Sequence, residues 1–204
     1  MKKIIKRSLL ALFAILLAMV VFLVPSSVQS SDQLKNVEDS ISLASIVESG
    51  LQNATLGTNG VSTELTIDSK QFNRLLKNYL SNNQNQVLLD SAYSIEGDKL
   101  RLQLPVKILG ISSKLDMRFQ VAVDNHTLRF DLASSHLGSL PVPKAIVASI
   151  LQDRLKNQSS NLAMDRQTIL VSLPDSQFKI TDLSVQDNAA KVKLTMSVTN
   201  LLGQ

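Results

Sequence analysis

His136 is the residue whose surroundings in the sequence most resemble a nucleophilic site, because Ser134, Ser135 and Ser139 lie within three positions of it. A serine beside a histidine can be activated for acyl transfer, but this chemistry also needs a third group that orients the imidazole, and an oxyanion hole. The sequence shows neither, so we expect His136 to be a loop residue exposed to solvent. The other histidine, His126, falls in a predicted Asp-Asn-His turn, and two histidines are too few for a His-rich metal site.

Two aspartates, Asp116 and Asp131, are predicted on outward faces two strands apart, where paired carboxylates would permit acid–base chemistry. Their predicted cross-strand neighbours, Lys114, Arg118 and Arg129, favour surface ion pairs instead. The chain has no G-x-S-x-G, P-loop, G-x-G-x-x-G or H-E-x-x-H motif. The sequence therefore predicts a protein that is not an enzyme, with no catalytic residue, no metal site and no cofactor.

Composition bounds the partners of this 204-residue chain. Its net charge of +4 comes from Lys2, Lys3, Lys6 and Arg7, since the other 17 of its 21 basic residues balance its 17 acidic residues. A neutral remainder without tryptophan makes nucleic acid an unsuitable partner, because phosphate binding needs clustered positive charge. The absence of cysteine excludes disulfides, thiol chemistry and lipoprotein acylation, and it suits an exported protein.

Residues 1–30 form a basic n-region followed by an uninterrupted run of 16 apolar residues, Leu9–Val24. Such a run spans about 24 Å as a helix, somewhat less than a hydrocarbon core of about 30 Å, and snorkelling lysine and arginine side chains can supply the difference. We expect an uncleaved single-pass anchor in the cell membrane. The alternative is a signal peptide cut after Ser30, which would release the protein. In both cases the basic n-region directs the rest of the chain outside the cytoplasm.

Residues 31–65 are predicted to be a polar tether with one short helix, and residues 66–204 an extracytoplasmic domain. The tether is interpreted as a spacer, with a partner-docking helix as the alternative. In the domain, the apolar residues of a first helix recur at helical spacing, and those of the following strands alternate. The first set is Phe72, Leu75, Leu76, Tyr79 and Leu80, and the strand residues run through Leu100–Ile108, Leu115–Val123, Leu128–Leu132, Ile169–Leu173 and the hairpin 178–198.

The stretch Ser134–Leu155 interrupts these strands. Gly138 permits a turn, while Pro141 and Pro143 force extended geometry before a second helix. We expect that helix to present one apolar face, made of Ile146, Val147, Ile150, Leu151 and Leu155, and to be followed by a polar loop at 156–167. The fold class predicted is α+β, a long curved antiparallel sheet of about six or seven strands covered by two helices, after one N-terminal transmembrane segment.

Several segments carry a resemblance to a known family. The anchor, the "IDSKQFNRLLKNYL" helix, the "LGSLPVPKAIVASIL" joint and the closing "ILVSLPDSQFKITDLSVQDNAAKVKLTMSV" together resemble the YpmS family of Firmicutes over residues 66–198. The family implies a membrane-anchored extracytoplasmic protein of unassigned activity, and a lipase-type envelope hydrolase as the partner to expect. More distantly, the leading helix with Asn73 on its polar side, followed by long strands, resembles tubular lipid-binding folds of bacterial envelope proteins.

The apolar face of the sheet supports the functional prediction. One interpretation is that this face is a closed core; the other is that sheet and helix leave a groove for a lipid or an acyl chain. We predict a membrane-tethered module that binds such an apolar ligand, with a non-enzymatic scaffold that docks a partner protein as the alternative. The predicted ligand-binding residues surround the joint and the second helix: Leu137, Leu140, Val142, Ile146, Val147, Ile150 and Phe119.

Overall fold

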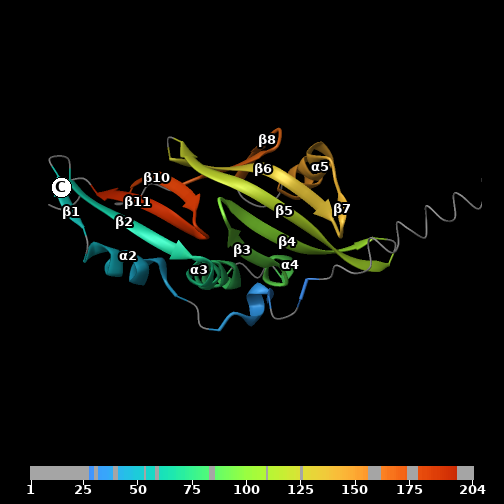
Figure 1. Cartoon of the computed structure of the whole chain (residues 1–204), viewed down its shortest axis with the longest axis horizontal. Helices are drawn as coiled ribbons and strands as arrows, with labels where there is room; N and C mark the ends of the chain where they lie inside the picture. The colour runs from blue at the N-terminus through green and yellow to red at the C-terminus, as the bar shows by residue number, and fades with distance from the viewer. Residues whose placement is uncertain are drawn as a thin grey trace, which may run out of the picture.

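A computed structural model describes residues 28–29, 32–38, 41–52, 54–57, 60–82, 86–108, 110–124, 126–155, 162–173 and 179–196. Within these ranges the chain has an α+β fold in which every strand pairing is antiparallel, and the strands form two sheets (Figure 1). The predicted membrane segment, Leu9–Val24, lies outside the described residues. Among the helices that are described, none is long and apolar enough to cross a membrane.

The larger sheet has seven strands, in the order β3-β4-β5-β6-β9-β8 with β7 paired to β6. Its strands are β3 (Ala92–Glu96), β4 (Lys99–Ile108), β5 (Ile111–Asp124), β6 (Thr127–Leu137), β7 (Leu140–Pro141), β8 (Leu162–Asp165) and β9 (Thr168–Ser172). The predicted alternation sets its register, because Leu100 pairs with Phe119 and Leu102 with Met117 on one face. Strand β8 corrects the prediction of a polar loop at 156–167, since its four residues return alongside β9.

The smaller sheet has the order β1-β2-β11-β10. Its strands are β1 (Thr55–Gly57), β2 (Gly60–Asp68), β10 (Lys179–Gln186) and β11 (Ala189–Met196). The predicted hairpin of β10 and β11 turns at Asp187 and Asn188, which both have positive φ, of 55° and 62°. The prediction of a single sheet is corrected here, because β11 pairs along its whole length with β2 and not with the strands of the larger sheet.

Four α-helices and one 3₁₀ helix are described in these ranges: η2 (Leu34–Asn36), α2 (Leu43–Leu51), α3 (Ser69–Asn82), α4 (Gln86–Leu89) and α5 (Lys144–Leu155). Helix α3 contains the predicted apolar stripe of the first helix, and a capping box explains its start. The Asp68 carboxylate accepts a hydrogen bond from the Gln71 backbone N–H (2.7 Å), and the Gln71 side chain accepts one from the Asp68 N–H (3.1 Å).

The interpretation of residues 31–65 as a polar tether does not fit the parts of that range that are described. Leu34 is buried and its N–H donates to the Ser91 carbonyl (2.8 Å) beside β3, while α2 packs on β2. The Asn78 side chain of α3 also donates to the Ile41 carbonyl (3.2 Å). These residues are therefore part of the folded domain, and α2 is the short helix that the sequence indicates within the range.

Two closed hydrophobic clusters lie at opposite ends of this arrangement. In the first, Val147 of α5 packs onto the inner face of the larger sheet with four buried side chains: Leu115, Met117, Phe119 and Leu132. In the second, Ile46 and Val47 of α2 pack onto Leu65 and Leu194 of the smaller sheet. Each sheet thus has one helix that covers part of its apolar face.

Candidate apolar binding cavity

An apolar cavity of about 370 Å³ lies between the two closed clusters, where the inner faces of the two sheets meet α3. Helix α3 lies at this junction, beneath the region where β10 and β11 approach β3, β4 and β5 (Figure 1). Fourteen side chains line the cavity: Ile67, Phe72, Leu75, Leu76, Ile95, Leu100, Val121, Leu128, Phe130, Ile180, Leu183, Val185, Ala190 and Val192. The volume falls within the usual range of small-molecule sites, about 300–1,000 Å³.

The lining follows from the two periodicities of the sequence. Phe72, Leu75 and Leu76 lie at i, i+3 and i+4 on α3 and so share one face, which points into the cavity. On the strands, register places Val121 opposite Phe130 and Leu183 opposite Val192, so each pair lies on one side of its sheet. The face that the sequence predicts to be buried on α3 therefore lines a cavity.

The wall of the cavity is made mainly of aliphatic side chains. Twelve of the fourteen are aliphatic, including Ala190 and four valine or isoleucine positions on the smaller sheet, and two are phenylalanine. A closed, empty cavity costs about 24 cal/mol per Å³, so one of this size would cost roughly 9 kcal/mol. That is comparable to the whole stability of a typical domain, about 5–15 kcal/mol. The cavity is instead open to solvent along part of its wall.

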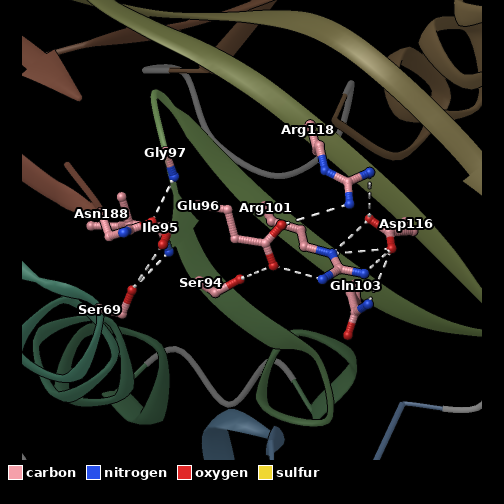
Figure 2. Close-up of polar contacts among 10 residues, drawn as sticks. All are labelled: Ser69, Ser94, Ile95, Glu96, Gly97, Arg101, Gln103, Asp116, Arg118 and Asn188. Atoms are coloured by element: carbon pink, nitrogen blue, oxygen red, sulfur yellow. Dashed lines mark hydrogen bonds and ion pairs between the residues drawn. The ribbon is translucent and has the colours of Figure 1, made fainter. Parts of the chain in front are cut away.

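Beside the cavity, hydrogen bonds join the end of β3 to the β10–β11 turn of the smaller sheet and to α3 (Figure 2). The Asn188 side chain, in the β10–β11 turn, accepts a hydrogen bond from the Gly97 N–H (2.7 Å), and the Asn188 N–H donates to the Gly97 carbonyl (3.2 Å). Ser69 of α3 accepts from the Ile95 N–H (2.8 Å). Ile67 and Ile95, the two lining residues that are buried, lie next to these hydrogen bonds, and the other lining residues are partly exposed.

The residues predicted from sequence to bind the ligand lie away from this cavity, and none of the seven lines it. Phe119 (3% exposed) and Val147 (0% exposed) belong to the closed cluster under α5, against which Val142 also packs. Ile146 and Ile150 are 54% and 47% exposed. The predicted single apolar face of α5 is therefore corrected: Val147, Ala148 and Leu151 face the sheet, while these two isoleucines project away from it.

The remaining predicted residues, Leu137 and Leu140, face each other across the Gly138–Ser139 turn that joins β6 to β7. Gly138 has a φ of 61°, which explains the glycine, and its N–H donates to the Lys114 carbonyl (2.8 Å). The Ser135 hydroxyl donates to the Val142 carbonyl (2.9 Å) and secures the chain before α5. The joint is therefore a structural turn that positions α5.

A polar cluster occupies the outer face of the larger sheet, on the side opposite the apolar face (Figure 2). Asp116 (side chain 8% exposed) accepts hydrogen bonds from Arg101 (Nε to Oδ1, 3.0 Å) and from Gln103 (Nε2 to Oδ2, 3.1 Å). Glu96 forms an ion pair with Arg101 (2.6 Å) and Arg118 lies within 3.9 Å of Asp116. Asp116 is thus buried, which differs from the predicted surface ion pair.

The electrostatics of this cluster favour charged side chains. Desolvation raises the pKa of Asp116, but hydrogen bonds from Arg101 and Gln103 and the charges of two guanidinium groups outweigh it, so the net pKa lies below its ordinary value. The hydrogen bond to Asp116 in turn raises the pKa of Arg101. The cluster is a satisfied network that holds β3, β4 and β5 together.

The residues with possible catalytic chemistry are not assembled into a site. His136 lies opposite Asp116 in the β5–β6 register, but both oxygens of that carboxylate are bound by Arg101. Asp131 is 44% exposed and pairs with Arg129 (3.7 Å), as predicted for a surface ion pair. In the described part of the chain, no group of three or more His, Cys, Asp or Glu side chains is placed to hold a metal ion.

Sequence reasoning missed the cavity because it placed the groove at α5. Part of the signal is visible, because the sequence predicts both the apolar stripe of α3 and the apolar alternation of β10 and β11. No local pattern shows that the apolar residues of α3 and those of β10 and β11 lie side by side, because they are about a hundred positions apart in the sequence, as Leu75 and Ile180 are.

Comparison of this chain with protein-family models, with curated proteins and with solved structures finds no match.

Proposed function

We propose that this protein is a non-enzymatic binding module that holds a lipid or an acyl chain in the cavity between its two sheets and α3. The observation that carries the proposal is a cavity of about 370 Å³ whose fourteen lining residues are all apolar. Sites for apolar ligands are concave and lined mainly by hydrophobic side chains. Filling such a cavity restores the dispersion contacts that its lining lacks.

The predicted location supports the same proposal. The sequence places an apolar segment, Leu9–Val24, before the folded domain, and a domain tethered by that segment works beside a membrane. Acyl chains are the most abundant apolar ligands at that place. The resemblance to the YpmS family remains a prediction alongside this proposal.

The test is photo-crosslinking of the full chain in cells. Cells that express the protein receive a fatty acid that carries a diazirine and an alkyne, and are irradiated before the protein is captured. We expect labelling of peptides from β10 and β11, which supply Ile180, Leu183 and Val185 and also Ala190 and Val192 to the lining.

Two alanines on β11 provide a matched pair of variants. Ala190 lines the cavity, whereas its neighbour Ala189 has its side chain on the other face of the strand. We expect Ala190→Phe to reduce labelling at least tenfold, because its ring occupies the space of the chain, and Ala189→Phe to leave labelling unchanged. Equal labelling of both variants, or labelling confined to other parts of the chain, would refute the proposal. A stoichiometric protein crosslink without any acyl labelling would favour the scaffold alternative.

A further inference from the structure

The lining of the cavity determines which part of a lipid or acyl ligand can enter it. No lining residue carries a polar side chain, and seven of the fourteen come from β2, β3, β4, β6 and β11, whose backbone groups pair with neighbouring strands. A polar group of a ligand would lose its hydrogen bonds to water there and gain no partner. Only hydrocarbon is therefore stable inside.

The volume limits how much hydrocarbon enters. A methylene group is about as large as a water molecule, which occupies about 30 Å³ in the liquid. A cavity of about 370 Å³ consequently has room for about a dozen carbon atoms. This is one unbranched chain of medium length. The second chain of a two-chain lipid would have to stay outside.

The charged residues next to the lining on β6 and β10 are not directed into the cavity. On β10, Lys179 and Asp182 are exposed, have opposite charges and lie next to Ile180 and Leu183, so they point to the opposite face of the strand. On β6, Arg129 and Asp131 flank the lining residue Phe130 and are paired with each other at 3.7 Å on the outer face of the sheet. None of these four charges selects a headgroup, so a carboxylate, a hydroxyl and a zwitterion are held about equally well.

We infer that the cavity binds one unbranched hydrocarbon chain of about a dozen carbons, selecting the chain by its length while the polar headgroup stays in solvent. This inference rests on the proposed function and specifies its ligand. The chain can belong to a free fatty acid or to a single-chain lipid, because the headgroup makes no contact that the cavity requires.

The experiment measures displacement of a fluorescent fatty acid from the full chain held in an amphipol. Competitors are saturated fatty acids of 8, 10, 12, 14 and 16 carbons, dodecanol, and lysophosphatidylcholine with a dodecanoyl chain. Each is also measured with Ala190→Phe in the same amphipol, and the difference between the two proteins is the binding by the cavity.

We expect affinity to rise about fourfold for each added methylene, which corresponds to about 0.8 kcal/mol. The rise is therefore roughly 200-fold between 8 and 12 carbons, and little further gain follows at 14 and 16. The three twelve-carbon ligands should bind within about threefold of one another. A rise that continues unchanged to 16 carbons, or a tenfold preference for one headgroup, would overturn this inference and leave the proposed function standing. Loss of binding at every length would overturn both.

Discussion

Removing the Asp116 carboxylate should destabilise the protein far more than removing Asp131, although both lie on the outer face of the same sheet. Asp116 is 8% exposed and bound by Arg101, Gln103 and Arg118, whereas Asp131 is 44% exposed. Breaking a fully buried ion pair costs about 3–5 kcal/mol, because the remaining charge is left without a partner. Arg101 is 24% exposed and keeps Glu96, so we expect about 2–3 kcal/mol for Asp116→Ala. For Asp131→Ala, an exposed pair, we expect less than about 1 kcal/mol.

The assay is urea unfolding of the two variants and the unchanged chain, followed by circular dichroism. With a slope of about 2 kcal/mol per molar urea, the midpoint for Asp116→Ala should fall by roughly 1 M, and the slope should stay constant. The Asp131→Ala midpoint should move by less than half of that. Similar shifts for the two variants, or a cost below about 1 kcal/mol for Asp116→Ala, would show that the polar cluster contributes little to stability.

Three further predictions concern the same fold. The pKa of Asp116 is lower in the folded protein than its ordinary value near 3.8, so its contribution to stability is complete above that value and is lost as the pH falls through the folded pKa. The urea midpoint of the unchanged chain should therefore fall when the pH is lowered below about 4, and the midpoint of Asp116→Asn should fall less. Gly50→Ala should lower the free energy of unfolding, measured by thermal unfolding, by about 1–3 kcal/mol, because its new Cβ would lie 1.9 Å from the Leu65 side chain. Gly57→Ala, where the nearest atom is 3.8 Å away, should be near neutral. Equal effects of the two substitutions would contradict the packing of α2 on β2. Asn188→Gly, which keeps the positive φ but removes the side-chain acceptor, should cost about 1 kcal/mol and speed hydrogen exchange at the Gly97 amide, and unchanged exchange there would refute the junction.

The elements that the sequence predicts well are those with local signals. The start of α3 is fixed by Asp68 and Gln71, the first and last residues of a four-residue capping box. The hairpin turns at Gly97 and at Asp187–Asn188 are set by residues that accept positive φ. In each case the residues that form the contact are within a few positions of one another, so the pattern is visible in one window of sequence.

The strand β2 shows why other elements were missed. Its buried face consists of Thr63, Leu65 and Ile67, and Thr63 has a polar side chain. Thr63 is buried because its hydroxyl donates to the Gly50 carbonyl of α2 (2.7 Å), a partner that only the folded chain supplies. Residues 31–65 contain many serine, asparagine and glycine residues and follow a helical period only loosely, so the sequence predicts a tether there.

The cavity depends on a feature that periodicity does not contain. Alternation identifies which face of a strand is apolar, and it says nothing about whether another element covers that face. Phe119 and Val121 are two positions apart on the same face of β5, yet the first lies in a closed cluster and the second lines the cavity. Their difference comes from α5, whose Val147 reaches the cluster and does not line the cavity.

The position of the cavity then follows from how far the covering helices extend. Helix α5 covers one end of the larger sheet and α2 covers part of the smaller sheet, so both ends have closed cores. Between them, cover comes from one stripe of α3, and the sheets are joined along one side by Ser69 and Asn188. In the part of the chain that the structure describes, the apolar side chains between these two clusters are therefore only partly buried. A hydrocarbon chain placed there would complete a core that runs from the Val147 cluster to the Ile46 cluster, because Phe130 contacts the first and Leu75 the second while both line the cavity.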